Sequence, residues 1–118
     1  MGRNILKEKS YLFALMVIKA YKGIIVNHKE YVLSKQLLKA GTAIGALIRE
    51  AEYGQSKSDF VSKMSIGLKE ANETEYWINL LRDSNYLDSS ESEQLITANQ
   101  ELMRLLISSI KTAKNNEQ

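Results

Sequence analysis

The sequence predicts an all-α protein: a single antiparallel four-helix bundle whose helices run up, down, up and down. The first observation is length, because 118 residues form one domain (1–118) and are too few for two. The second is composition, because the chain has no proline and only 6 glycines, the residues that break helices. The third is that apolar residues recur at alternating spacings of three and four, as in packed helices.

The first helix is expected over about residues 4–26. Its core stripe has spacings of four, three and four and consists of Phe13, Val17, Ala20 and Ile24. Four further apolar residues cover much of its remaining surface: Leu12, Leu15, Met16 and Ile18. A helix with one intramolecular face does not need them, so we predict that they form an oligomer interface. Asn27, which tolerates the left-handed conformation, is expected to end the helix together with His28.

The second helix is expected over about residues 31–52, ended by Tyr53 and Gly54. Its seam consists of Leu33, Leu37, Ala40, Ile44, Leu47 and Ala51. Gly41 and Gly45 leave one face of this helix nearly bare, and Gly67 with Ala71 does the same on the third helix. We therefore expect the second and third helices to approach each other closely at these residues.

The third helix is expected over about residues 57–84. Ser56 can cap a free backbone N–H, with Asp59 at the third helical position as in a capping box. The seam of this helix consists of Phe60, Met64, Gly67, Ala71, Thr74, Ile78 and Leu81. A turn is expected around residues 85–89.

The fourth helix is expected over about residues 91–113. Ser90 and Glu93 have the spacing of a second capping box and mark its start. Its seam consists of Leu95, Ala98, Leu102, Leu105 and Ser109.

Residues that carry chemistry are scarce. Without cysteine there is no thiolate metal site and no cysteine nucleophile. His28 is the only histidine, and the Glu-x-x-His motif that di-iron bundles require does not occur. No glycine-rich phosphate loop occurs either. The sequence therefore predicts no enzyme, no metal site and no cofactor.

Basic residues gather in the first part of the chain. Residues 1–52 hold nine Lys or Arg against four Asp or Glu, and residues 53–118 hold seven against ten. Two explanations stay open: a weak polyanion-binding face, or charge complementarity between helices or subunits. The candidate nucleic-acid contacts are Lys19, Lys22, Lys29, Lys35 and Lys39. The adjoining Tyr76 and Trp77 either stack on bases or pack against a neighbouring helix.

The N-terminus lacks the basic, apolar and small-residue order of a secretory signal. The richest apolar run, Tyr11 to Ile18, has eight residues, whereas a bilayer-spanning helix needs about 20. We therefore expect a cytoplasmic protein without a membrane segment.

Five segments between residues 33 and 81 resemble one known family. They read QLLK at 36–39, TAIGALIREA at 42–51, SDF at 58–60, KMSIGLKEA at 63–71 and ETEYW at 73–77. Together they make the chain similar to the four helix bundle proteins, also known as the 23S ribosomal RNA intervening-sequence proteins. That family resembles the accessory protein of diversity-generating retroelements, a barrel-shaped homopentamer that engages nucleic acid and a reverse transcriptase. The resemblance implies a ring-like homo-oligomer, most simply a pentamer, that binds RNA or DNA.

The chain departs from the family's pattern at informative places. The family favours Arg where Lys39 stands, Ser at Ala40 and Ala43, and Asn at Leu47. Three of these four positions are apolar here, so a polar site of the relatives at these positions is not carried over. The retained carboxylates are interpreted as structural polar residues: Glu50, Glu70 and Glu73. A buried carboxylate needs a partner, and the candidates are Lys39, Arg49 and Lys69.

The function predicted from the residues and the resemblance is that of a non-enzymatic, oligomeric, nucleic-acid-associated accessory protein. The alternative is a scaffold that recruits another protein without binding nucleic acid. Expected partners are further copies of the chain, RNA or DNA, and a protein.

Overall fold

Four α-helices make up most of the chain in the computed structural model, which describes residues 2–116. They are α1 (Gly2–His28), α2 (Leu33–Glu52), α3 (Lys57–Asp83) and α4 (Ser89–Asn115). No strand occurs among these residues. The predicted all-α class with four helices is therefore confirmed.

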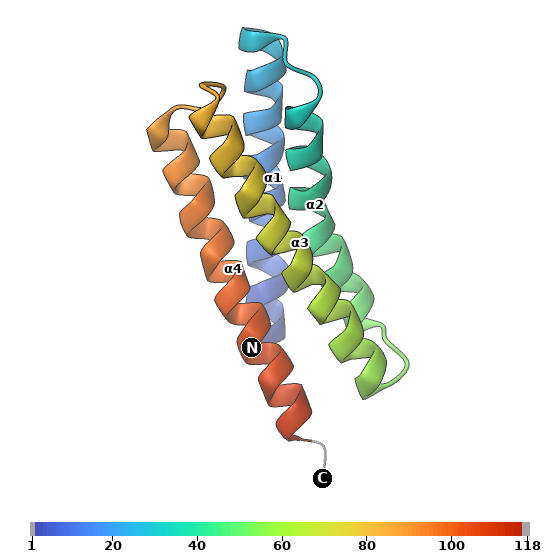
Figure 1. Ribbon diagram of the computed structural model, residues 1–118. Coiled ribbons are helices and arrows are strands. Elements are labelled where there is room, and N and C mark those ends of the chain that lie inside the picture. Colours follow the sequence, from blue (N-terminus) through green and yellow to red (C-terminus); the bar gives the residue numbers. More distant parts are fainter. Residues whose placement is uncertain (1, 117–118) are drawn as a thin grey trace.

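The helices pack in the cyclic order α1, α2, α3, α4, and α1 also contacts α4 (Figure 1). Short connections join them, at residues 29–32, 53–56 and 84–88. In Figure 1 the α1–α2 and α3–α4 connections lie at one end of the molecule and the α2–α3 connection at the other. The result is an elongated body of 52 × 21 × 20 Å.

The end of α1 differs from the sequence prediction. The helix continues through His28, and Lys29, with a φ of 54°, takes the left-handed conformation that was expected at Asn27. The first turn of α2 is capped from Glu30, so only the left-handed Lys29 separates the end of α1 at His28 from this capping residue. Asn27 is therefore an ordinary helical residue.

Glu30 organises the start of α2. Its carboxylate accepts hydrogen bonds from the backbone N–H groups of Val32 (3.0 Å), Leu33 (2.8 Å) and Ser34 (2.8 Å). Because of this cap the helix begins at Leu33, two residues after the predicted start. Burial raises the pKa of Glu30, but hydrogen bonds from the three N–H groups and from the Ser34 side chain together lower it by more, so its pKa lies below the ordinary value.

The two remaining caps give one confirmation and one correction. The Ser56 hydroxyl accepts a hydrogen bond from the Asp59 N–H at 3.0 Å, as predicted. At α4, however, the Asp88 carboxylate accepts from the Glu91 N–H at 2.7 Å, and the helix begins at Ser89. The predicted Ser90–Glu93 box is wrong because a carboxylate two residues earlier already caps the first turn.

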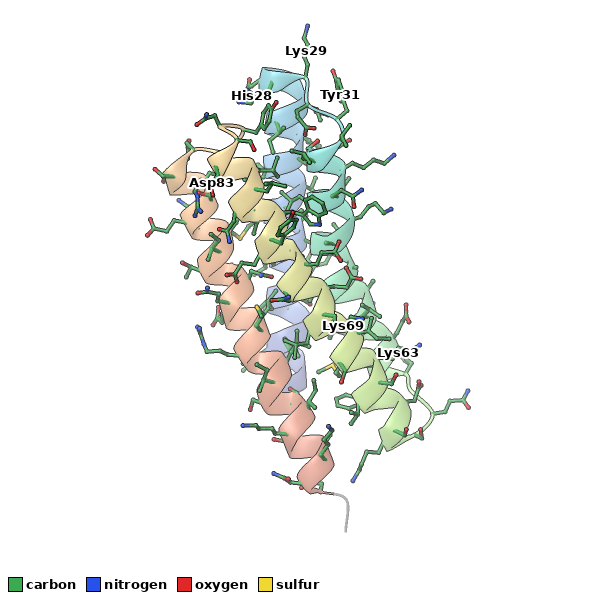
Figure 2. All side chains as sticks on the ribbon, in the orientation of Figure 1. His28, Lys29, Tyr31, Lys63, Lys69 and Asp83 are labelled. Carbon is green, nitrogen blue, oxygen red and sulfur yellow. The ribbon has the colours of Figure 1, made fainter. Side chains whose placement is uncertain are left out.

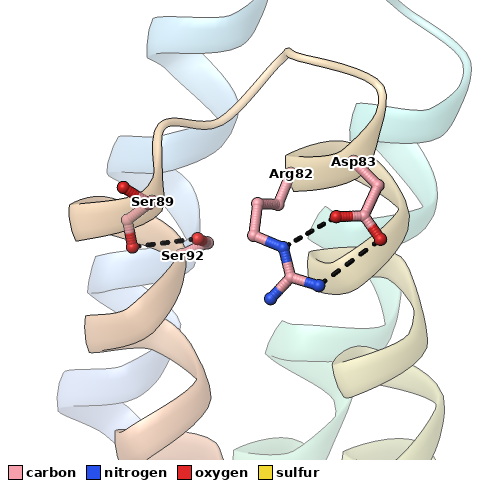
Figure 3. Close-up of polar contacts among 4 residues, drawn as sticks. All are labelled: Arg82, Asp83, Ser89 and Ser92. Atoms are coloured by element: carbon pink, nitrogen blue, oxygen red, sulfur yellow. Dashed lines mark hydrogen bonds and ion pairs between the residues drawn. The ribbon is translucent and has the colours of Figure 1, made fainter.

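Local polar contacts lie on either side of the α3–α4 connection, at the end of α3 and in the first turn of α4 (Figure 3). Arg82 Nε lies 2.9 Å from Asp83 Oδ1, and this hydrogen bond holds the pKa of Asp83 below its ordinary value. The Ser92 hydroxyl donates to the Ser89 carbonyl oxygen at 3.1 Å. Asn85, with a φ of 70°, turns the chain within the predicted segment.

The core follows the predicted stripes, with shifts of one residue. The stripes of α1 and α3 are buried as predicted, except that Phe60 is half-buried. In α2, Ile48 is buried and Leu47 is half-buried. In α4 the corresponding exchanges are Asn99 for Ala98 and Leu106 for Leu105, and the predicted seam residues Leu33 of α2 and Ser109 of α4 are also only half-buried. At most of these exchanges two apolar residues are adjacent in the sequence. Packing against the neighbouring helices therefore selects which of the two is buried.

Gly41 and Gly45 face α1, and the predicted close contact with α3 is wrong. A Cβ at Gly41 would lie 2.8 Å from Val17 Cγ2, and a Cβ at Gly45 would lie 3.3 Å from Ser10 Oγ. Gly67 does face α2, but a Cβ there would lie at an ordinary 3.7 Å from Leu47 Cβ. The glycines on α2 therefore set the distance between α1 and α2.

Asn99 links α4 to α3 inside the core. Its Nδ2 donates to the Ala71 carbonyl oxygen at 2.8 Å, while its Oδ1 is buried and has no partner among the described residues. The buried Ser10 and Thr74 instead donate to carbonyls of their own helices. A buried amide that bonds across a helix pair favours one register over others.

Candidate functional site

The contact between Val17 and Gly41 divides the α1–α2 pair into two halves. Residues 18–28 of α1 lie beside residues 33–40 of α2, next to the connection, and we call this region the connection half. Residues 5–16 lie beside residues 42–52, as the contact of Ser10 with Gly45 and the 3.4 Å ion pair of Lys7 with Glu52 show. We call this region the distal half.

An apolar ridge lies on the outer side of α1 in the distal half. Spacings of three and four connect seven exposed residues along α1: Ile5, Glu8, Leu12, Leu15, Lys19, Lys22 and Val26. The first four form what we call the α1 ridge, in which Leu12 is 53% and Leu15 48% exposed.

The predicted interface residues divide between this ridge and its flanks. Leu12 and Leu15 belong to the α1 ridge, whereas Met16 and Ile18 are half-buried and flank it. Met16 packs partly against the core. Sequence reasoning did not single out Ile5 or Glu8, although extending the same spacing toward the N-terminus would have found both.

A groove of about 630 Å³ lies between α1 and α2 in the distal half. Small residues line much of it: Ala14, Thr42, Gly45 and Ala46. Tyr11 and Arg49 also line it, and both are exposed. The groove could not be found from the sequence, because it depends on how closely Gly45 lets α2 approach α1.

Four of the predicted nucleic-acid contacts lie in the connection half and Lys29 lies in the adjoining connection, which we count with that half from here on; all five are exposed: Lys19, Lys22, Lys29, Lys35 and Lys39. Within residues 2–116, none of them forms an ion pair. Figure 2 shows Lys29 and Tyr31 projecting from the connection at this end of the molecule. These five lysines span 21 positions of the sequence, and the fold places them together on the connection half of the α1–α2 pair.

The carboxylates near these lysines differ in how far they compensate the lysine charges. The three backbone N–H groups at the start of α2 occupy the carboxylate of Glu30. Lys19 lines a hollow together with Asp88 and Glu91 of α4, so its charge is partly compensated. The lysines of the connection and of α2 therefore carry the clearest positive charge.

The carboxylates expected to be structural lie mostly at the surface. Glu50 and Glu73 are exposed and Glu70 is half-buried, because these positions lie outside the buried stripes of α2 and α3. Glu50 pairs with Lys63 of α3 at 3.3 Å, and Glu73 accepts from Trp77 Nε1 at 3.0 Å. The predicted ion pairs of buried carboxylates with Lys39, Arg49 or Lys69 are therefore wrong.

Trp77 and Tyr76 differ in burial. Trp77 is half-buried and packs against the core, whereas Tyr76 is exposed, and their rings meet edge to face at 5.0 Å. This favours the packing interpretation for Trp77.

The described residues offer surfaces for binding. Across them, no group of three or more His, Cys, Asp or Glu is placed to hold a metal ion. His28 is exposed, and its ring meets the edge of Tyr86 at 5.4 Å. An apolar ridge, a groove and exposed lysines are features that bind macromolecules.

One segment of α1 has the length and composition of a membrane-crossing helix, Ile5–His28. The eight-residue run considered in the sequence understates this property, because Lys19 and Lys22 interrupt an otherwise apolar stretch. In the structure α1 buries Phe13 and Val17 in the bundle, and 28% of the candidate window is buried.

Comparison with known proteins identifies the family. The sequence model of the 23S rRNA-intervening sequence proteins matches residues 3–108. The chain belongs to this family. A crystal structure from Bacteroides thetaiotaomicron, described as a protein of unknown function from the S23 ribosomal protein family, is 48% identical with a TM-score of 0.92. The match covers 94% of this chain and 99% of that one. No curated protein matches the sequence significantly.

Proposed function

We propose that this member of the 23S rRNA-intervening sequence family is a non-enzymatic, homo-oligomeric accessory protein that binds nucleic acid through its connection half. The observation that carries the proposal is the group of five exposed lysines on one half of the α1–α2 pair, without ion pairs among the described residues. Lysines placed in this way bind phosphates irrespective of base sequence. Family membership supports nucleic acid as the polyanion.

Tyr31 supports a single strand as the preferred form. It is 59% exposed and stands in the connection between Lys29 and Lys35. Aromatic side chains among cations stack on unpaired bases, which a duplex does not present.

The proposal includes self-association in the cytoplasm, without a membrane. In this view each subunit is an up-down-up-down antiparallel bundle, and subunits close into a ring, most simply a pentamer. The exposed α1 ridge supports self-association, because soluble monomers rarely keep such apolar surface exposed. Five-fold closure rests on the resemblance to the retroelement accessory protein. A ring would repeat a weak basic face and strengthen binding through avidity.

A salt titration of binding tests this function. Fluorescence anisotropy would follow single-stranded RNA, duplex RNA and DNA with the wild type and with the triple variant Lys29→Glu, Lys35→Glu and Lys39→Glu. We expect weaker binding and a flatter salt dependence in the variant, because up to three phosphate contacts are lost.

The matched control changes the same charge at the other end of the bundle. Lys57→Glu, Lys111→Glu and Lys114→Glu alter three exposed lysines near the start of α3 and the end of α4. This control should bind more tightly than the first triple variant. Equal binding by the two variants, or no binding by the wild type at low salt, contradicts the proposal.

A protein-binding scaffold is the second candidate. The groove between α1 and α2 and the neighbouring α1 ridge favour it, because both present apolar surface of a kind that proteins bind. This function takes precedence if the wild type binds none of the three nucleic acids at low salt.

A further inference from the structure

We propose that the α1 ridge of one copy of this chain docks into the α1–α2 groove of the next copy. The contact is head to tail, since it joins two different surfaces. It rests on the self-association part of the proposed function and specifies which surfaces meet.

The first argument is shape. The ridge presents large side chains, Ile5, Leu12 and Leu15, that are about half exposed. Five of the ten residues that line the groove are small, among them Gly45 and Ala46, and its volume is about 630 Å³. Large side chains that enter a hollow between small ones give the dense packing typical of oligomer interfaces.

The second argument is height along the bundle. Gly45 of α2 contacts Ser10 of α1, and Glu52 pairs with Lys7, so Arg49, which lies between them on α2, is level with residues 7–10 of α1. In a ring whose axis runs along the helices, neighbouring subunits meet at equal heights. Glu8 of one ridge then meets Arg49 of the next groove, and Leu12 meets the small residues around Gly45.

The third argument is charge. Glu8 is the acidic residue of the ridge and also stands at the rim of its own subunit's groove, and Arg49 is an exposed cation lining the groove. Lys7, the other cation of the groove, is already paired with Glu52 at 3.4 Å, whereas neither Glu8 nor Arg49 forms an ion pair in the described part of the chain. Docking therefore brings Glu8 of one copy beside Arg49 of the next, two opposite charges that form no ion pair with the described residues of their own subunit.

The geometry allows each subunit to engage two neighbours at once. The ridge lies on the outer side of α1, and the groove lies on the side that faces α2, with Glu8 and Leu12 at their common rim. A head-to-tail contact repeated from copy to copy forms a closed ring when its rotation closes.

A charge-swap experiment on the full chain tests the contact. Light scattering coupled to size exclusion would give the mass of the wild type, of Glu8→Arg, of Arg49→Glu and of the double variant. We expect each single change to weaken assembly at least about ten-fold, since like charges then face each other, and the double swap to restore the wild-type mass.

Filling the groove gives a second, independent test. Ala46→Trp places a large ring in the groove from an exposed position, and Ser108→Trp, on an exposed position of α4, is its control. We expect Ala46→Trp to yield smaller species with unchanged helicity by circular dichroism, and Ser108→Trp to keep the wild-type mass.

Three results would overturn the inference: single charge variants with wild-type mass, a double swap as dissociated as the single variants, or intact assembly of Ala46→Trp. If the wild type assembles, such results would overturn only this contact and would leave the proposed function standing. A wild type that is monomeric at all concentrations would overturn both this contact and the proposed self-association. Loss of nucleic-acid binding alone would affect only the proposed function.

Discussion

The two halves of the α1–α2 pair are built from the same two helices but present surfaces of different chemical character. The connection half carries five exposed lysines, whereas the distal half carries the α1 ridge and the small-residue groove. Both halves use the same buried stripe of α1 toward the core, and only their outward residues differ. The difference teaches that the outer surface of α1 changes along the helix, from the apolar ridge in the distal half to Lys19 and Lys22 in the connection half, as the two proposed binding roles require.

The largest effect is expected where the two halves meet. Gly41→Leu should lower the free energy of unfolding by about 2 kcal/mol, because overpacking against the stiff Val17 side chain outweighs the gain in helix propensity. Chemical denaturation followed by circular dichroism measures this change. Gly23→Ala is the control, since a Cβ there meets no heavy atom within 4 Å and should raise stability by up to about 1 kcal/mol. An unchanged midpoint for Gly41→Leu would show that this contact does not align the two halves.

The next effect concerns the cap in the connection half. Glu30→Gln should lower the free energy of unfolding by about 1 kcal/mol at neutral pH, because a charged acceptor of three N–H groups is replaced by a neutral one. The pKa of Glu30 is lowered in the folded state, so its contribution is present above the unfolded pKa and is lost as the pH falls through the folded pKa.

Denaturation curves from neutral to acidic pH check this prediction. The wild type and Glu30→Gln should differ most at neutral pH and converge in acid, where Glu30 is protonated. A difference that stays constant with pH would mean that the carboxylate charge contributes nothing to the cap.

The smallest effect on the bundle itself is expected at the ridge. Leu12→Glu combined with Leu15→Glu should change the stability of the isolated subunit by no more than about 0.5 kcal/mol, since both side chains are about half exposed. The same double variant should reduce the oligomer to smaller, still helical species. Light scattering and circular dichroism measure the two effects separately, and loss of helicity would place these residues in the core. Met16 is left unchanged because it packs partly against the core.

The sequence predicts the helices and most of the core correctly. Its predictions fail where two nearby residues could each take the same buried or capping position. Phe13 and Val17 were predictable because their stripe continues through Ala20 and Ile24 without a charged residue, whereas the other line of the same spacing on α1 contains Glu8, Lys19 and Lys22. Leu105 and Leu106 adjoin, and packing against the other helices selects Leu106 for the core. The start of α4 was misplaced because Asp88 and Ser90 both have capping side chains, and the geometry of the connection selects Asp88.

The sequence by itself determined four helices, their inward stripes and the excess of apolar residues on α1, because these follow from spacing and composition within one helix. Only the tertiary structure decided that Gly41 and Gly45 face α1, that five lysines share one half, and that a groove opens beside the ridge. These properties depend on the rotation and height of one helix against another. The packing of facing side chains sets both, and no periodicity within a single helix encodes them.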